Sequence, residues 1–154
     1  MGESGEKWGT KMFIGEYKHS IDEKGRVALP AKFRGKLADG VVITKGLENS
    51  LVVYTNNEWE KIADDIARMP YTQSNARAFS RMVLAGAHDC KLDRQGRINI
   101  PQNLREFAGL KTNAVVVGVY SRIEIWDVKE WEEYQSRIEK DSGQIAEQLD
   151  SFGM

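Results

Sequence analysis

Apolar and polar residues alternate along two stretches of the chain that follow the same pattern. Residues 20–30 and 91–101 each contain, in order, an apolar residue, Asp, two polar residues, Gly, Arg, an apolar–variable–apolar triplet and Pro, with an offset of 71 residues from Asp22 to Asp93. Alternation on both sides of a polar turn that contains glycine predicts a β-hairpin. We therefore expect two copies of one hairpin.

The residues after the first copy predict a short helix, two strands and a longer helix. Pro30 suits the first turn of a helix over 31–37, where its missing N–H costs nothing. Strands are predicted over 41–44 and 51–54, which are rich in β-branched residues, and residues 55–58 have the form of a capping box. The helix that this box begins has one apolar face, made of Trp59, Ile62, Ile66 and Met69.

The second copy is followed by the same elements. Pro101 and Gly109 bracket a short helix, and strands are predicted over 114–119 and 122–126. Asp127 is expected to cap a helix with the apolar stripe Trp131, Tyr134 and Ile138. Two units of this size cannot each bury a sheet alone, so an α+β fold is expected in which they pack about a pseudo-twofold axis.

Three segments lie outside the two units. Residues 74–87 predict a helix with Ala76, Phe79 and Val83 on one face, and residues 142–152 are acidic and compatible with a helix. The expected organisation is a disordered leader or added segment ahead of Met12 (1–11), a first repeat (12–70), a linking helix (71–88), a second repeat (89–140) and a helical tail (141–154).

The composition is that of one ordinary domain. The chain has 154 residues, of which 41% are hydrophobic, enough for a core. Its single cysteine excludes an internal disulfide and fits a reducing cytosol. The longest apolar runs are far too short to cross a bilayer. A cytoplasmic location is therefore expected.

The net charge of −1 conceals a sorted pattern. Residues 12–45 and 66–111 carry about +3 and about +5, whereas residues 46–65 and 112–154 carry about −4 and about −5. Each basic segment contains one repeated turn. An assembly could thus present one basic and one acidic face. The alternative is that acidic helices simply lie beside basic hairpins on a solvated surface.

Arg26 and Arg97 are the strongest candidates for chemistry. An arginine just beyond a turn glycine on a protruding hairpin can enter a DNA groove and donate two hydrogen bonds to guanine. Asp22 and Asp93, four residues earlier, could orient each guanidinium, and Gly25 supplies the positive φ that a tight turn needs. The pattern indicates an aspartate that orients the guanidinium and an arginine that reads the DNA base.

A structural interpretation of the same residues stays open. Each Asp–Arg pair could be an internal ion pair that only shapes the turn, and this alternative is stronger for Arg97, whose copy has Gln95 where the first has Lys24. If the first turn does bind DNA, basic residues near it are expected to contact phosphates, which positions a protein without reading sequence. These residues are Lys18, Lys24, Lys32 and Arg34.

The sequence disfavours an enzyme. His88, Asp89 and Cys90 are consecutive in an extended segment and so point to alternate faces, and the only other histidine is His19. There is no glycine-rich phosphate loop, nucleophile elbow or pair of zinc ligands. No cofactor and no metal are predicted.

These motifs together resemble the MraZ family of bacterial proteins. The resemblance covers residues 12–145 and is carried by both Asp-x-x-Gly-Arg turns with their following prolines, by 84–87, by 104–110 and by 124–126. Each turn alone is a weak signal, but two at this separation with a helix between them are specific.

The resemblance implies a fold and a function. The fold is a pair of tandem AbrB-like swapped-hairpin units that form a compact pseudo-dimeric β-barrel, with protomers assembled into a ring. The function is transcriptional regulation of the bacterial division and cell-wall gene cluster at the nucleoid, through tandem direct repeats in promoter DNA. The family's Asp-x-x-x-Arg pairs fall on Asp22 with Arg26 and on Asp93 with Arg97.

A second function, of another class, is a protein-interaction module of the antitoxin type. In that case the acidic segments 46–65 and 112–154 would bind a basic protein partner.

Overall fold

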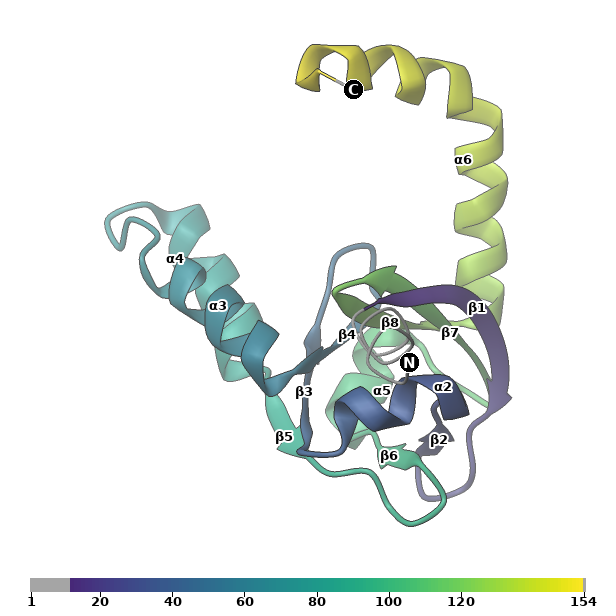
Figure 1. The fold of residues 1–154 in the computed structure, drawn as a ribbon. Helices are drawn as coiled ribbons and strands as arrows, with labels where there is room; N and C mark the ends of the chain where they lie inside the picture. The colour runs from purple at the N-terminus through teal and green to yellow at the C-terminus, as the bar shows by residue number, and fades with distance from the viewer. Residues whose placement is uncertain (1–11, 154) are drawn as a thin grey trace, which may run out of the picture.

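The computed structural model describes residues 12–153 and has an α+β fold (Figure 1). The predicted leader, residues 1–11, lies outside the described residues. A six-stranded antiparallel sheet and a separate two-stranded ribbon enclose the core, and helices project from the sheet. No helix within residues 12–153 is both long and apolar enough to cross a membrane.

The first half contains the elements expected from its pattern. In chain order they are β1 (Phe13–Ser20), β2 (Arg26–Ala28), α2 (Ala31–Arg34), the 3-10 turn η1 (Gly35–Leu37), β3 (Val41–Lys45), β4 (Leu51–Thr55) and α3 (Asn56–Ala67). Thr55 caps α3 by accepting a hydrogen bond from the Glu58 N–H. The apolar stripe ends at the buried Ile66. The expectation for Met69 is wrong, because α3 ends at Ala67, ahead of Pro70.

The second half repeats this series. It consists of β5 (His88–Cys90), β6 (Arg97–Asn99), α5 (Gln102–Ala108), β7 (Asn113–Tyr120), β8 (Arg122–Asp127) and α6 (Val128–Leu149), followed by the 3-10 turn η3 (Asp150–Phe152). Asp127 caps α6 through the N–H groups of Lys129 and Glu130. The segment expected to begin separately at Ser142 is the continuation of α6, which projects from the sheet and bends towards its end (Figure 1).

The helix predicted over 74–87 is present but changes its winding. It is α-helical as α4 (Ser74–Ser80) and π-helical as η2 (Arg81–Ala85). The buried Thr44 hydroxyl donates a hydrogen bond of 2.6 Å to the Val83 carbonyl in this π turn. This bond ties the helix to β3.

The two halves exchange their leading strands. The order of the large sheet is β1-β7-β8-β4-β3-β5, so β1 of the first half pairs with β7 of the second, and β5 of the second pairs with β3 of the first. The return strands β2 and β6 pair with each other, with Val27 opposite Ile98. Each half therefore completes the sheet of the other.

This pairing corrects two expectations. The first predicted hairpin does not form its own ladder, since a single bridge, Ile21 to Val27, joins its arms. The expected closed barrel is also wrong for residues 12–153, because the sheet is open with β1 and β5 as its edges. After each turn only three residues extend before Pro30 or Pro101, which lacks an N–H, so β2 and β6 are too short to close the large sheet and form their own ribbon.

One apolar core is shared by both halves. It contains side chains from β1, the ribbon, both short helices and the four central strands β3, β4, β7 and β8. Its largest fully buried members include Phe13, Leu29, Phe33, Ile98, Ile100, Leu104, Ile123 and Ile125. A second, smaller cluster of Val115, Val117 and Trp126 lies on the outer face, where Trp131 and Tyr134 of α6 cover it. Burial on this scale is the main force that holds the halves together.

Candidate nucleic-acid interface

The β2–β6 ribbon brings the two repeated turns to one end of the molecule. Val27 and Ile98 face the core and are fully buried. Since neighbouring residues on a strand point to opposite faces, Arg26 and Arg97 point outward. Figure 1 shows the ribbon on the side of the sheet away from α6. The arrangement thus presents both arginines on one outer surface, remote from the acidic helix.

Each aspartate holds its turn together in the same way. Oδ1 of Asp22 accepts hydrogen bonds from the N–H groups of Lys24 (3.0 Å) and Arg26 (2.9 Å), while Oδ2 accepts one from Arg26 Nε (2.6 Å). The turn glycine, Gly25, has φ +81°. The Gly25 N–H also donates a hydrogen bond of 2.9 Å to the Asp22 carbonyl, which closes the turn.

The second turn reproduces these contacts. Asp93 Oδ1 accepts from the N–H groups of Gln95 and Arg97, both at 2.9 Å, and Oδ2 accepts from Arg97 Nε at 2.8 Å. Gly96 has φ +76°. The turns are thus built alike although one has lysine and the other glutamine in the middle.

These hydrogen bonds favour the charged form of both carboxylates. The N–H of Arg26 lowers the pKa of Asp22 below its ordinary value of 3.8; partial desolvation opposes the effect, and the Arg26 side chain and the Lys24 N–H add to it. The pKa of Asp93 is lowered for the same reasons, first by the N–H of Arg97. Both aspartates are therefore ionised at neutral pH.

The two arginines differ in what remains available for a ligand. The Arg26 side chain donates one hydrogen bond, from Nε to Asp22, and within residues 12–153 no hydrogen bond engages its terminal nitrogens. Arg97 additionally places Nη1 3.7 Å from Asp22 Oδ2, which links the two turns. Their side chains are 32% and 27% exposed. The terminal nitrogens of Arg26 thus remain as hydrogen-bond donors for a ligand, whereas Arg97 is held by both aspartates.

The other predicted contacts are not all gathered at the ribbon. Lys24 is exposed within the first turn. Lys18 lies on β1 and makes an exposed ion pair of 3.8 Å with Glu132 of α6, and the Lys32 ammonium lies 5.1 Å from the centre of the Tyr17 ring. Arg34 donates from Nε to the Leu29 carbonyl (2.9 Å). The structure therefore groups Asp22, Lys24, Gly25, Arg26, Asp93 and Arg97, with Arg34 beside Gly96 of the second turn. It engages Lys18 and Lys32 elsewhere.

Reasoning from the sequence missed one residue near the first turn. Arg105, on α5, lies against Gly25 and lines a hollow beside the hairpin. It is the counterpart of Arg34 at the same 71-residue offset that relates the turns. Applying that offset to every charged residue, rather than to the turns alone, would have drawn attention to it.

Comparison with known proteins places these features in a family. The model of the family described as "MraZ protein, putative antitoxin-like" matches the chain twice, over residues 12–82 and 83–152. A protein of Natranaerobius thermophilus named transcriptional regulator MraZ is 49% identical over 141 residues, covering 92% of this chain and 99% of its own. Proteins of the same name from Thermoanaerobacter pseudethanolicus and Caldanaerobacter subterraneus are 48% and 47% identical over 143 residues, covering 93% of this chain and all of their own. The chain therefore belongs to the MraZ family, a family of transcriptional regulators rather than enzymes, and consists of two tandem MraZ domains.

Proposed function

We propose that this protein is a sequence-specific DNA-binding regulator that acts on tandem promoter repeats of the division and cell-wall gene cluster. The observation that carries the proposal is the pair of Asp–Arg turns side by side on one outward ribbon. The names of the relatives support a role in transcription. This function requires the protein to be in the cytoplasm, at the nucleoid.

The pairing of the strands supports tandem AbrB-like swapped-hairpin units about a pseudo-twofold axis. Val27 pairs with Ile98, its own counterpart at the 71-residue offset. Val52 pairs with Glu124, its counterpart at the offset of 72 residues that relates Trp59 to Trp131. A residue that pairs with its own counterpart lies next to the symmetry axis. Such an axis passes through both sheets and makes the ribbon a symmetric reading element.

Arg26 is the residue we assign to base reading. Its Nε is fixed by the Asp22 carboxylate, which orients the planar guanidinium, and its terminal nitrogens make no hydrogen bond within residues 12–153 and are left as a pair of donors. This is the geometry that guanine O6 and N7 accept in the major groove. Arg97 serves as a helper that also links the turns through Asp22.

The basic residues around the turns supply phosphate contacts in this proposal. Lys24 is the best placed, since it is exposed in the first turn. Lys18 and Lys32 would add to the binding surface only by leaving their present partners, which are exposed or partly exposed contacts. Phosphate contacts make affinity fall as salt rises.

Assembly into a ring completes the proposal. One hairpin with one reading arginine makes few base contacts, and a lone site is expected to be bound weakly. Several copies on a rigid particle raise the effective concentration of each hairpin, so repeated sites are held together by avidity. The spacing of the subunits would then select the spacing of the DNA repeats.

The decisive experiment is protection mapping of the DNA upstream of the gene with wild type, Arg26→Ala and Arg97→Ala. Loss of one bidentate contact costs about 1–3 kcal/mol per site, so Arg26→Ala is expected to lose protection while its circular dichroism and oligomer mass stay those of wild type. Arg97→Ala is expected to weaken protection less. Normal protection of the repeats by Arg26→Ala would refute the assignment.

The same experiment bears on the antitoxin-type alternative, which the family description and the exposed acidic face of α6 favour. Under that function the wild type protects no DNA, and a basic protein partner is recovered with it in stoichiometric amount.

A further inference from the structure

We propose that Arg34 and Arg105 are positioning residues, each of which holds the Asp–Arg turn of the opposite half in its DNA-binding shape. The inference rests on the proposed function for its consequence at DNA, but its structural part is independent of it. Arg34 follows the first turn and covers the second, whereas Arg105 follows the second turn and covers the first.

The first turn is covered by Arg105 from α5. A Cβ placed on Gly25 would lie 2.5 Å from Arg105 Nη1 and 2.6 Å from its Cζ, so the guanidinium lies directly against the glycine. The Gly25 carbonyl accepts a hydrogen bond of 2.9 Å from the Ile100 N–H, also of the second half. The opposite half therefore contacts Gly25 twice, with the Arg105 guanidinium at its Cα and with the Ile100 N–H at its carbonyl.

The second turn is covered in the same manner by Arg34 from α2. A Cβ on Gly96 would collide with Nε of Arg34, and the Gly96 carbonyl accepts a hydrogen bond of 2.9 Å from the Leu29 N–H. Both glycines thus have two reasons to lack a side chain, their positive φ and the guanidinium above them. The arrangement is reciprocal between the halves.

The backbone around Arg105 fixes where its side chain begins. Its neighbours Leu104 and Ala108 are buried in the core, and its own carbonyl accepts a hydrogen bond from the Leu110 N–H (2.9 Å) just beyond the left-handed Gly109. The end of α5 is therefore anchored by the core and by this hydrogen bond. A guanidinium, planar and broad, can lie flat on a glycine from this position, whereas a lysine ammonium is compact and cannot.

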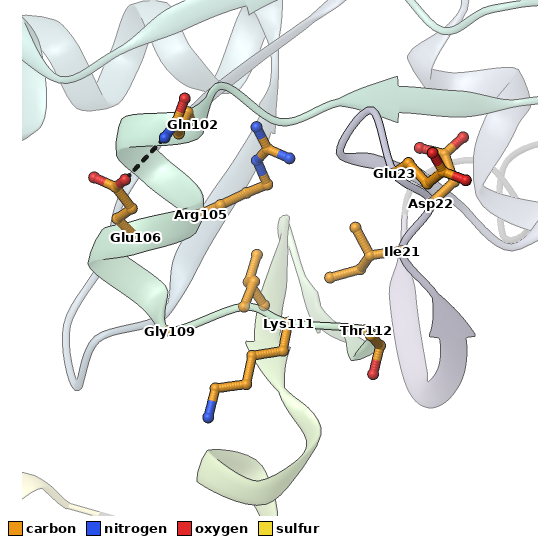
Figure 2. A pocket seen from close by; sticks show the side chains of 10 residues that line it. Ile21, Asp22, Glu23, Gln102, Arg105, Glu106, Gly109, Lys111 and Thr112 are labelled. Atoms are coloured by element: carbon orange, nitrogen blue, oxygen red, sulfur yellow. Dashed lines mark hydrogen bonds between the residues drawn. The ribbon is translucent and has the colours of Figure 1, made fainter.

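The surroundings of Arg105 favour a role in positioning the first turn over a role in binding DNA phosphate. Its Nε is buried and has no hydrogen-bond partner, unlike Nε of Arg34, which donates to Leu29. The adjoining hollow, of about 510 Å³, is lined by three carboxylates, Asp22, Glu23 and Glu106, and besides Arg105 by one further cation, Lys111. Figure 2 shows Arg105 reaching from α5 toward the side of the hollow that Asp22 and Glu23 occupy. The three carboxylates outnumber the two cations there and disfavour a DNA phosphate, so we assign Arg105 to the turn.

The consequence is that each hairpin depends on the half that does not contain it. If the guanidinium is removed, the turn keeps its aspartate bonds but loses the surface against which the glycine rests. Arg26 then samples more orientations, which lowers discrimination between DNA sequences. Affinity that comes from phosphates alone is unaffected.

Amide hydrogen exchange of the DNA-free protein tests the structural part. Arg105→Ala is expected to speed exchange of amides 24–26 on the order of tenfold and to leave amides 95–97 unchanged, because local opening is governed by local contacts. Arg34→Ala should do the reverse. Arg105→Lys, which keeps the charge, should behave as Arg105→Ala, and Arg68→Ala, which loses an exposed arginine on the surface, should change neither turn.

An effect confined to the turn in the same half as the substitution, or no effect at either turn, would overturn the proposal. Protection restored by Arg105→Lys would also overturn it, since charge alone would then be sufficient. Should Arg105→Ala fail to fold, Arg105→Lys and the Arg34 variants decide the question.

Binding to the promoter repeats and to a scrambled fragment of equal length tests the functional part. Arg105→Lys is expected to reduce the ratio of the two affinities roughly tenfold, the order of one bidentate base contact, with the salt dependence unchanged. A phosphate contact would instead weaken both fragments equally and lower the salt slope by about one. If wild type binds neither fragment, the proposed function fails, and hydrogen exchange still decides whether the arginines brace the turns.

Discussion

Asp22 and Asp93 bind backbone and arginine at once, and this joins two interpretations that the sequence left as alternatives. Each carboxylate uses one oxygen for two backbone N–H groups and the other for Nε of its arginine. An internal ion pair that shapes the turn is therefore present. It also leaves both terminal nitrogens of Arg26 without a hydrogen bond among residues 12–153, so shaping the turn and reading DNA are compatible roles.

The lowered pKa of both aspartates makes part of the stability depend on pH. A carboxylate whose folded pKa is depressed stabilises the fold above its unfolded pKa, and this contribution is lost as the pH falls through the folded pKa. The unfolded value is near 3.8. We expect the difference in free energy of unfolding between wild type and Asp22→Asn/Asp93→Asn to be constant above about pH 5 and to shrink below pH 3.8.

Urea unfolding of both proteins between pH 2.5 and 7, about the range over which carboxylates titrate, measures this difference. A difference that does not change across that range would mean that the carboxylates contribute through hydrogen-bond geometry alone and not through their charge.

At the scale of elements, the exchanged strand β1 depends on a close approach to β7. Gly15 pairs with Gly118, and the strands pack so tightly that a Cβ on Gly118 would lie 2.5 Å from both the Phe13 carbonyl carbon and the Ile14 nitrogen. Both neighbouring atoms belong to the backbone and cannot turn aside. Glycine at this position is a condition for the exchange.

Gly118→Ala is therefore expected to destabilise the protein by about 1–3 kcal/mol, the usual cost of adding a group where the packing is already tight. Gly143→Ala is the matched control, because no atom lies within 4 Å of the added methyl and the position is in the exposed helix α6. It should stabilise the helix by up to about 1 kcal/mol. Denaturant unfolding of both variants measures the contrast, and equal effects would contradict the close approach.

The elements themselves follow from local patterns to a large extent. The two long helices begin directly after their caps, Thr55 and Asp127, as predicted, and Gly109 ends α5 with φ +64°. These are short-range properties, since a cap or a left-handed glycine acts within a few residues. The π turn over Arg81–Ala85 had no local signal, because its carbonyl at Val83 is satisfied by Thr44, 39 residues away.

At the scale of the whole molecule, strand exchange makes the two MraZ domains one cooperative body. Neither half has a complete sheet alone, and the main core takes side chains from both. The ribbon then places the two turns on one surface as a consequence of this assembly. A single chain thus presents one pair of Asp–Arg turns, and the proposed ring would present several such pairs.

Avidity from the ring gives a prediction at this scale. A DNA fragment with several promoter repeats is expected to bind at least about 100-fold more tightly than a fragment with one repeat, and changing the repeat spacing should remove most of the gain. Titrations on both fragments, with the particle mass measured by light scattering, test this. Equal affinity for one and several repeats would argue against simultaneous engagement.

The sequence by itself determined the two copies of the turn, their Asp, Gly and Arg residues, and the kinds and order of the elements after them. These depend on side-chain periodicity and backbone preferences within about ten residues. Only the tertiary structure decided which strands pair, that the large sheet stays open, and that Arg105 rests on Gly25, 80 positions earlier in the chain. The pairing of strands is set by burial of apolar faces across the whole molecule, so the sequence of one strand does not specify which other strand it pairs with.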